Sequence, residues 1–179
     1  MGNLKVYTME FGEGSAFNCI SLVDFPAVEE DFIQLDKVHT LLSINDERRI
    51  VSGVALIPDK LIYRRDAVRG EYYITFPQET IEKMAMEFFK QHKNTEGNVQ
   101  HSVDVQGVNF FESYILNKER GICPNEFKSL PNGTWIVSAK IDNEDVWKLV
   151  KEGKLRGFSI DASLIMKSDI EHLLDNYNK

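Results

Sequence analysis

Cysteine is scarce in this sequence, because only Cys19 and Cys123 occur among its 179 residues. Two cysteines do not make the disulfide framework on which small secreted domains depend, and the chain is long enough to bury a sizeable hydrophobic core. The N-terminus lacks a basic segment followed by an apolar run, and no apolar stretch reaches the roughly 18 residues that a membrane span requires. We therefore expect a soluble protein that is made in a reducing cytoplasm and does not enter a membrane.

Positive charge is also in short supply, because 21 Lys and Arg residues stand against 28 Asp and Glu residues, and the formal net charge is −7. A surface with this balance repels phosphate backbones, so we do not expect a nucleic acid as partner. Histidine is rare as well, and the four histidines show no close spacing of the kind that metal ligands have: His39, His92, His101 and His172. We expect neither a metal nor another cofactor.

Short apolar and β-branched runs predict a chain that is mostly strand. The predicted strands are 4–9, 17–23, 32–35, 41–44, 50–57, 72–76, 99–105, 108–117, 135–141 and 158–166. Apolar residues at helical spacing predict a helix over 78–92, Asn143 is placed to cap a second helix, and residues 168–171 resemble the capping box of a third. We expect a β-rich α+β protein whose single domain spans residues 1–179. Its predicted architecture is a closed or nearly closed β-barrel with two or three helices packed outside.

A histidine and a glutamate occupy apolar faces of two consecutive predicted strands. His101 shares one face of the strand over 99–105 with three valines, and Glu112 is the only acid on its face of the strand over 108–117. If residues 106–107 form a two-residue hairpin turn, counting outward places His101 opposite Glu112, with Cβ atoms roughly 4.5–5.5 Å apart. A carboxylate at that distance can orient an imidazole and stabilise its protonated form. The same pair can equally serve as a structural bridge between strands, and a one-residue bulge would remove it.

The segment over 156–161, with the sequence RGFSID, carries a candidate nucleophile. Ser159, Asp161 and Ser163 point to one face of the predicted strand, and Gly157 leaves space for another backbone to approach closely. A serine hydroxyl becomes a good nucleophile only when a base removes its proton, and His101 is the candidate base. Most outward-facing serines on strands are merely solvated, so this pattern alone does not distinguish the two roles.

Several segments together resemble one family, and their order and spacing carry the resemblance. They are 23–28 (VDFPAV), 51–58 (VSGVALIP), the strand over 72–74 with the helix after it, His101 followed by 107–108 and 112–113, 131–135 (PNGTW), the helix around Trp147, and 157–161 (GFSID). Taken over most of the chain, the sequence resembles the XkdF-like phage serine proteases, which are prohead maturation proteases related to herpesvirus assemblin.

The resemblance implies an assemblin-like β-barrel endopeptidase that cleaves capsid and scaffold proteins inside the procapsid, in the host cytoplasm. His101 matches the catalytic histidine of the family, and Ser159 matches its nucleophile. Glu112 is the expected third member of the triad, and Asp161 is the alternative, at a position where the family more often has glutamate. His172 resembles the second histidine that assemblin carries after its serine, and it is the third candidate for the remaining member of the triad.

Other functions stay open at this point. The chain could be a catalytically inactive capsid-assembly or scaffold component that keeps a protease-like barrel, because fold does not guarantee activity. A cysteine hydrolase that pairs Cys19 or Cys123 with His101 is a further alternative. Backbone N–H groups near Gly157 or in the loop over 119–133 are candidate donors of an oxyanion hole, with Arg156 as an electrostatic aid. Cleavage specificity and a homo-oligomeric state are not readable from the sequence.

Overall fold

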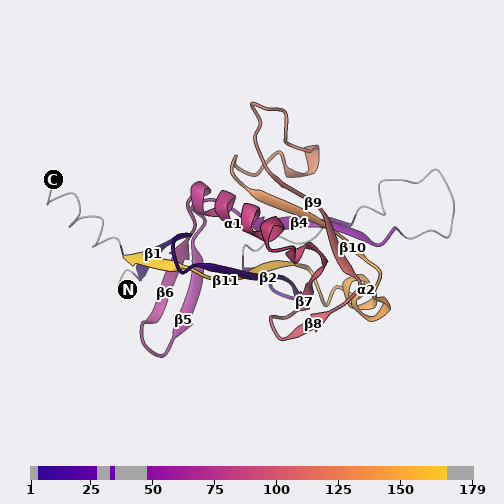
Figure 1. The fold of residues 1–179 in the computed structure, drawn as a ribbon, viewed down its shortest axis with the longest axis horizontal. Coiled ribbons are helices and arrows are strands. Elements are labelled where there is room, and N and C mark those ends of the chain that lie inside the picture. The colour runs from indigo at the N-terminus through magenta and orange to yellow at the C-terminus, as the bar shows by residue number, and fades with distance from the viewer. Residues whose placement is uncertain (1–3, 28–32, 35–47, 169–179) are drawn as a thin grey trace, which may run out of the picture.

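Three four-stranded sheets make up the part of the chain that the structure, a computed structural model, describes: residues 4–27, 33–34 and 48–168 (Figure 1). Sheet A has the strand order β12-β1-β6-β5, sheet B has the order β11-β2-β7-β8, and sheet C has the order β3-β4-β10-β9. Figure 1 shows β1, β5 and β6 gathered toward one end of the long axis, with β10 and α2 toward the other.

The strands follow the predicted runs closely in most places. Their bounds are β1 Lys5–Glu10, β2 Ala16–Val23, β3 Ile33–Gln34, β4 Ile50–Leu56, β5 Ile62–Asp66, β6 Gly70–Thr75, β7 Gly97–Val99, β8 Val103–Val105, β9 Val108–Ile115, β10 Trp135–Ile141, β11 Gly157–Ser163 and β12 Ile165–Ser168. The helices are α1 Gln78–Lys90 and α2 Glu144–Lys151, with short 3-10 turns at η2 Lys93–Thr95 and η3 Asn125–Phe127. Among the described residues, no helix combines the length and apolar character that crossing a membrane requires.

The predicted closed or nearly closed barrel is wrong. Each sheet keeps two edge strands, and no ladder between described strands joins one sheet to another, as closure would require. The predicted strand over 99–105 is interrupted by Gln100 and His101, which both have a φ of 54°. In this left-handed region the chain reverses, so β8 folds back onto β7 instead of pairing with β9. Sheet B and sheet C therefore stay separate where the barrel was expected to continue.

Other differences from the predicted elements have local causes. The predicted strand over 158–166 is broken at Leu164, and its two parts belong to different sheets. β5 was not predicted, because Arg64, Arg65 and Asp66 hide its strand pattern. The predicted strand over 41–44 and the predicted C-terminal helix lie outside the described residues.

Sheets A and B are connected through two pairs of strands. β1 and β2 follow one another along the chain, as do β11 and β12. β1 pairs with β12 in sheet A, and β2 pairs with β11 in sheet B, antiparallel in both cases. The chain passes from sheet A to sheet B near Gly12 and Gly14, and it returns at Leu164.

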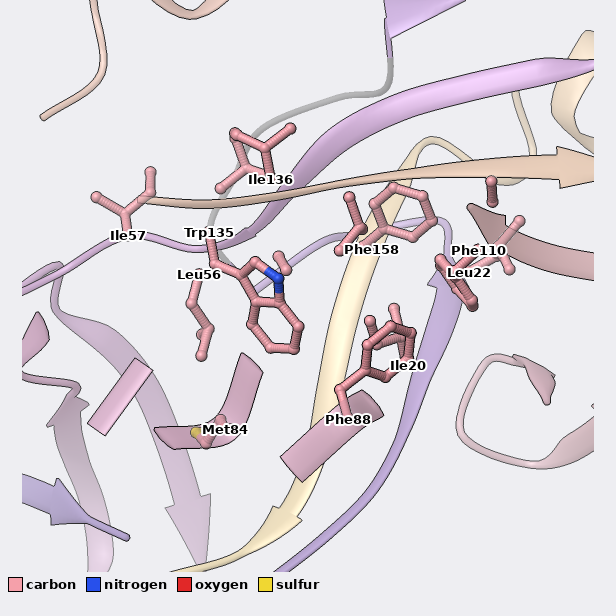
Figure 2. Close-up of a cluster of buried hydrophobic side chains, with 14 of the residues drawn as sticks. Ile20, Leu22, Leu56, Ile57, Met84, Phe88, Phe110, Trp135, Ile136 and Phe158 are labelled. Atoms are coloured by element: carbon pink, nitrogen blue, oxygen red, sulfur yellow. The ribbon is translucent and has the colours of Figure 1, made fainter. Parts of the chain in front are cut away.

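Aromatic side chains form the centre of the hydrophobic core (Figure 2). Phe88 from α1 lies against Trp135 from β10 and Phe110 from β9, with ring centroids 5.9 and 5.5 Å apart. Ile81, Met84 and Phe88 occupy the buried stripe of α1, as their helical spacing predicts. The side chain of Asn143 accepts a hydrogen bond from the Val146 N–H at 3.0 Å, which confirms the predicted cap of α2. This core supports the inner faces of sheets B and C.

Gly97 is placed where two strands approach very closely. A Cβ atom added at Gly97 would come within 2.6 Å of the Cβ of Val108. Real Cβ atoms do not approach so closely, so a side chain here would push β7 away from the start of β9. The close approach fixes the position of the neighbouring Asn98.

We expect Gly97→Ala to destabilise the protein by about 1–3 kcal/mol, because the added methyl group overpacks a fully buried contact. The measurement is urea unfolding followed by tryptophan fluorescence. Glu96→Ala, which changes only an exposed neighbouring side chain, is the matched control and should shift the midpoint little. A Gly97→Ala midpoint equal to that of wild type would contradict the close approach of β7 and β9.

Candidate active site

The ladder between β2 and β11 places polar side chains on one face of sheet B. Ser159 pairs with Ser21, and Asp161 pairs with Cys19. Since alternate residues of a strand share a face, these four side chains lie together on the face turned away from the core. The intervening residues Ile20, Leu22 and Phe158 are fully buried on the core face. The predicted sharing of one face by Ser159 and Asp161 is confirmed.

A row of polar residues continues across sheet B from Ser159. Ser21 pairs with Asn98 of the parallel strand β7, and Asn98 pairs with Asp104 of β8. The Ser21 hydroxyl donates to Asn98 Oδ1 at 2.9 Å, and Asn98 Nδ2 donates to Asp104 Oδ1 at 2.8 Å. The row therefore joins four strands, and three of its members form one chain of hydrogen bonds.

His101 lies in the three-residue loop between β7 and β8, not on the apolar face of a strand. The loop is closed by a hydrogen bond from the Ser102 N–H to the Val99 carbonyl. This turn brings the imidazole over the polar row, where His101 Nδ1 is 3.1 Å from Ser21 Oγ. The His101 side chain is exposed, whereas Ser21 is fully buried. The base that the sequence predicted is thus held beside the strand that pairs with the strand of Ser159.

The direction of the hydrogen bonds fixes the tautomer of a neutral His101. The Asp104 carboxylate can only accept, so Asn98 turns its NH₂ toward Asp104 and its oxygen toward Ser21. Ser21 gives its proton to that oxygen and must accept from His101 Nδ1–H. The lone pair is then on Nε2, which leaves that nitrogen able to take a proton.

The two paired serines differ in what their hydroxyls can do. The Ser21 hydroxyl is committed to Asn98 and His101. The Ser159 hydroxyl makes no hydrogen bond within the described part of the chain, although its residue is only 7% exposed. Directly paired residues have Cβ atoms roughly 4.5–5.5 Å apart. Of the two paired serines, Ser159 is therefore the one whose hydroxyl proton is not already donated to a neighbour within the described part of the chain.

Asp161 lies next to the imidazole of His101. Each of three residues, Cys19, His101 and Asp161, offers one ligand atom, and these three atoms lie within 4.8 Å of one another. A bulge in the β2 ladder at Asn18 turns the Asn18 amide toward Asp161, and Asn18 Nδ2 donates to Asp161 Oδ1 at 3.0 Å. The carboxylate is thus oriented by a neighbour and stands on the same face as Ser159.

Glu112 lies in a different sheet, and its predicted pairing with His101 is wrong. β9 pairs with β10, and the ladder skips Phe111, which is a bulge between Phe110 and Glu112. Because a one-residue bulge moves the following side chains to the opposite face, Glu112 no longer shares a face with Phe110. Its carboxylate accepts instead from Ser138 Oγ at 2.6 Å.

The surroundings of Glu112 form a second polar site. Ser138 Oγ is also 2.5 Å from Ser52 Oγ. Glu112 and Ser52 line a cavity of about 540 Å³ with Tyr114 and Cys123. Burial, followed by the charge of Glu112, raises the pKa of Tyr114 to about 12. His101 does not line this cavity, so the structure does not bring Glu112 together with the two other predicted triad residues.

A cavity of about 350 Å³ opens beside His101 and Asp161. Its walls are mostly apolar and come from sheet A, α1 and β11: Met9, Ile74, Phe76, Met84, Ile160, Ala162 and Leu164. Arg64 is the cation among the lining residues, and its guanidinium donates to the carbonyl of Tyr63. Burial lowers the pKa of Arg64.

Burial and charge also act on Cys19. Desolvation raises the pKa of its thiol, and the charges of Asp161 and Asp104 raise it further, against a hydrogen bond between Cys19 and Ser21 that lowers it. The thiol therefore favours its protonated form, which is a poor nucleophile. Cys123 lies across the molecule in the cavity beside Glu112, so it does not meet His101. Both cysteines are free.

The sequence patterns missed Ser21, Asn98 and Asp104 as members of this site, and they named Cys19 only in the cysteine hydrolase alternative. No local pattern placed these residues together, because they meet only when β2 and β7 pair in parallel across a long stretch of sequence. Of the other predicted residues, Gly157 is buried and pairs with Val23. His172 lies outside the described residues.

Comparison with known families gives a match to most of the chain. A family model described as "Putative phage serine protease XkdF" matches residues 37–167. The matched range includes His101, Ser159 and Asp161, whereas Cys19 and Ser21 precede it. No curated protein and no solved structure shows a significant match.

We expect the alkylation of Cys19 by iodoacetamide to have its midpoint at higher pH in the folded protein than in the unfolded chain, because the folded state disfavours the thiolate. The measurement is the rate of mass increase against pH in a Cys123→Ser variant, with and without urea. A folded-state midpoint below that of the unfolded chain would instead indicate an activated thiolate and favour the cysteine hydrolase alternative.

Proposed function

The chain belongs to the family of phage serine proteases named XkdF, and from this premise we propose that it is an endopeptidase with Ser159 as nucleophile and His101 as general base. One observation carries the assignment: the free hydroxyl of Ser159 stands opposite Ser21, which holds the imidazole of His101. Both residues also match the catalytic positions of the phage proteases that the sequence resembles.

Asp161 is the acid that best fits this pair. Its carboxylate lies within 4.8 Å of a ligand nitrogen of His101, on the same face as Ser159. Glu112 is bound to Ser138 in sheet C instead. A carboxylate near an imidazole stabilises the cation that forms when the imidazole takes a proton. Asp161 was the alternative third member on sequence grounds, and the geometry favours it over Glu112.

The reaction is acyl transfer to water. Ser159 Oγ attacks the carbonyl carbon of a peptide bond and gives its proton to His101 Nε2. The imidazolium then donates that proton to the leaving amine, and the acyl group stays on Ser159. Water attacks the acyl-enzyme with His101 again acting as base, and the serine is restored. Ser21 accepts from His101 Nδ1–H throughout, so the ring keeps one orientation.

The expected substrates are capsid and scaffold proteins of an immature phage head. This assignment comes from the resemblance to the prohead maturation proteases and places the enzyme inside the procapsid. The cavity beside His101 supports a peptide substrate, because it offers an apolar recess next to the nucleophile strand.

An inactive capsid-assembly component is the alternative, and one observation favours it. The Ser159 hydroxyl is not hydrogen-bonded to His101. Catalytic hydrogen bonds are often loose in free enzymes and tighten when substrate binds, so this geometry is compatible with activity.

Labelling by a fluorophosphonate separates the two functions, because only an activated serine reacts with it. We expect wild-type protein to label at Ser159 and Ser159→Ala to lose all labelling while keeping its unfolding midpoint. Ser21→Ala is the matched control on the paired strand, and it should still label, more slowly. Wild-type protein that stays unlabelled, or a label found on Ser21, would overturn the assignment of Ser159.

The identity of the acid can be tested by two isosteric changes. We expect Asp161→Asn to slow the labelling of Ser159 by roughly 10²- to 10⁴-fold, because the charge that stabilises the imidazolium is lost. Glu112→Gln should change the rate less than about threefold, since its partner Ser138 is remote from His101. A larger loss of labelling rate in Glu112→Gln than in Asp161→Asn would instead support Glu112 as the third member of the triad.

A further inference from the structure

Three side chains beside the candidate nucleophile offer donor atoms of three kinds. Cys19 supplies a sulfur from β2, Asp161 supplies an oxygen from β11, and His101 supplies a nitrogen from the loop between β7 and β8. Their ligand atoms lie within 4.8 Å of one another. Cysteine, histidine and aspartate together are ligands that zinc accepts, and a thiolate favours zinc over magnesium or calcium.

The geometry comes close to that of a tetrahedral zinc site. Zinc bonds of about 2.0–2.3 Å place neighbouring donor atoms about 3.3–3.8 Å apart, so the three donors need to close by about 1 Å. Cys19 and Asp161 are directly paired across a ladder, which holds their side chains on one face. The exposed imidazole of His101 is on a short loop and can make the remaining movement. The cavity that His101 and Asp161 line has room for water as a fourth ligand.

The local charge favours a cation at this point. Asp161 and Asp104 both act on the Cys19 thiol, and Lys93 is the positive group that acts on it. Among the described residues, the carboxylate of Asp161 accepts a hydrogen bond from Asn18 Nδ2 alone, on one of its oxygens, so lone pairs remain for a metal. Arg64 also lines the cavity beside Asp161, and Lys93 is paired with Glu96. The three carboxylates of Asp161, Asp104 and Glu96 therefore exceed these two cations by one charge, and Asp161 keeps an unsaturated acceptor.

We propose that Cys19, His101 and Asp161 bind a zinc ion reversibly, and that the bound ion inhibits the protease. Binding replaces the thiol proton of Cys19 with the metal and releases that proton to solvent, with no change of oxidation state. A neutral imidazole has one nitrogen lone pair, and zinc occupies it while the other ring nitrogen keeps its proton. His101 therefore no longer accepts the proton of Ser159. The inhibitory half of this inference rests on the proposed function, whereas the binding half does not.

The binding half is tested with cobalt(II), a coloured substitute for zinc, on the Ser159→Ala variant. We expect one equivalent to bind with a sulfur-to-cobalt charge-transfer band and the visible bands of a tetrahedral ion, and zinc to displace it. In this background, Cys19→Ala should lose the charge-transfer band and weaken binding about tenfold or more. Cys123→Ala is the matched control and should keep both. An absent band, or one that depends on Cys123, overturns the site whatever the protease assay shows.

The inhibitory half is tested by fluorophosphonate labelling of proteins that keep Ser159. Zinc should slow the labelling of wild-type protein at least tenfold, chelation by EDTA should restore it, and equal magnesium should have no effect. Each variant is compared with itself in the absence of zinc, and Cys19→Ala should respond to zinc much less than Cys123→Ala does. Unchanged labelling of zinc-loaded protein overturns the inhibition alone. Protein that never labels removes the proposed function and the inhibition with it, and the cobalt titration still decides whether the site exists.

Discussion

The hydrogen bonds from Asp104 through Asn98 and Ser21 to His101 are the constraint on which the candidate site depends. They connect three strands of sheet B and a loop. The donor or acceptor role of each polar group is set by the group before it in this chain of hydrogen bonds. The last member, His101, would otherwise be an exposed side chain on a short turn, free to adopt many rotamers. The buried middle members of the chain, Asn98 and Ser21, give it one orientation beside the strand of Ser159.

Local sequence patterns were sufficient to predict most of the strands and helices and part of the candidate site. The bounds of β10 and the cap of α2 agree with their predictions, because alternation and capping depend on neighbouring residues alone. The same holds for Ser159 and Asp161, whose common face follows from the period of a strand. The pattern also singled out His101 as the candidate base, although it placed this residue on a strand instead of in a loop.

The errors all concern contacts between residues that are distant in sequence or depend on one irregular residue. A bulge at Phe111 separated Glu112 from the face on which alternation had placed it. Left-handed backbone at Gln100 and His101 turned a predicted strand into a hairpin, and the barrel lost its closing ladder. Single residues of this kind leave little trace in an apolar pattern, although each one redirects every side chain that follows.

Sheets A and B are connected by two neighbouring pairs of strands, and this connection has a mechanical consequence. β1 with β12 and β2 with β11 make a double crossing between sheets A and B, so neither sheet can rotate without bending both strands at the crossing. Sheet A carries Arg64 and Ile74 on one wall of the cavity, and sheet B carries His101 on the other. A change in the angle between sheets A and B would therefore bend β11, the strand of Ser159, and would change the width of the cavity in the same movement.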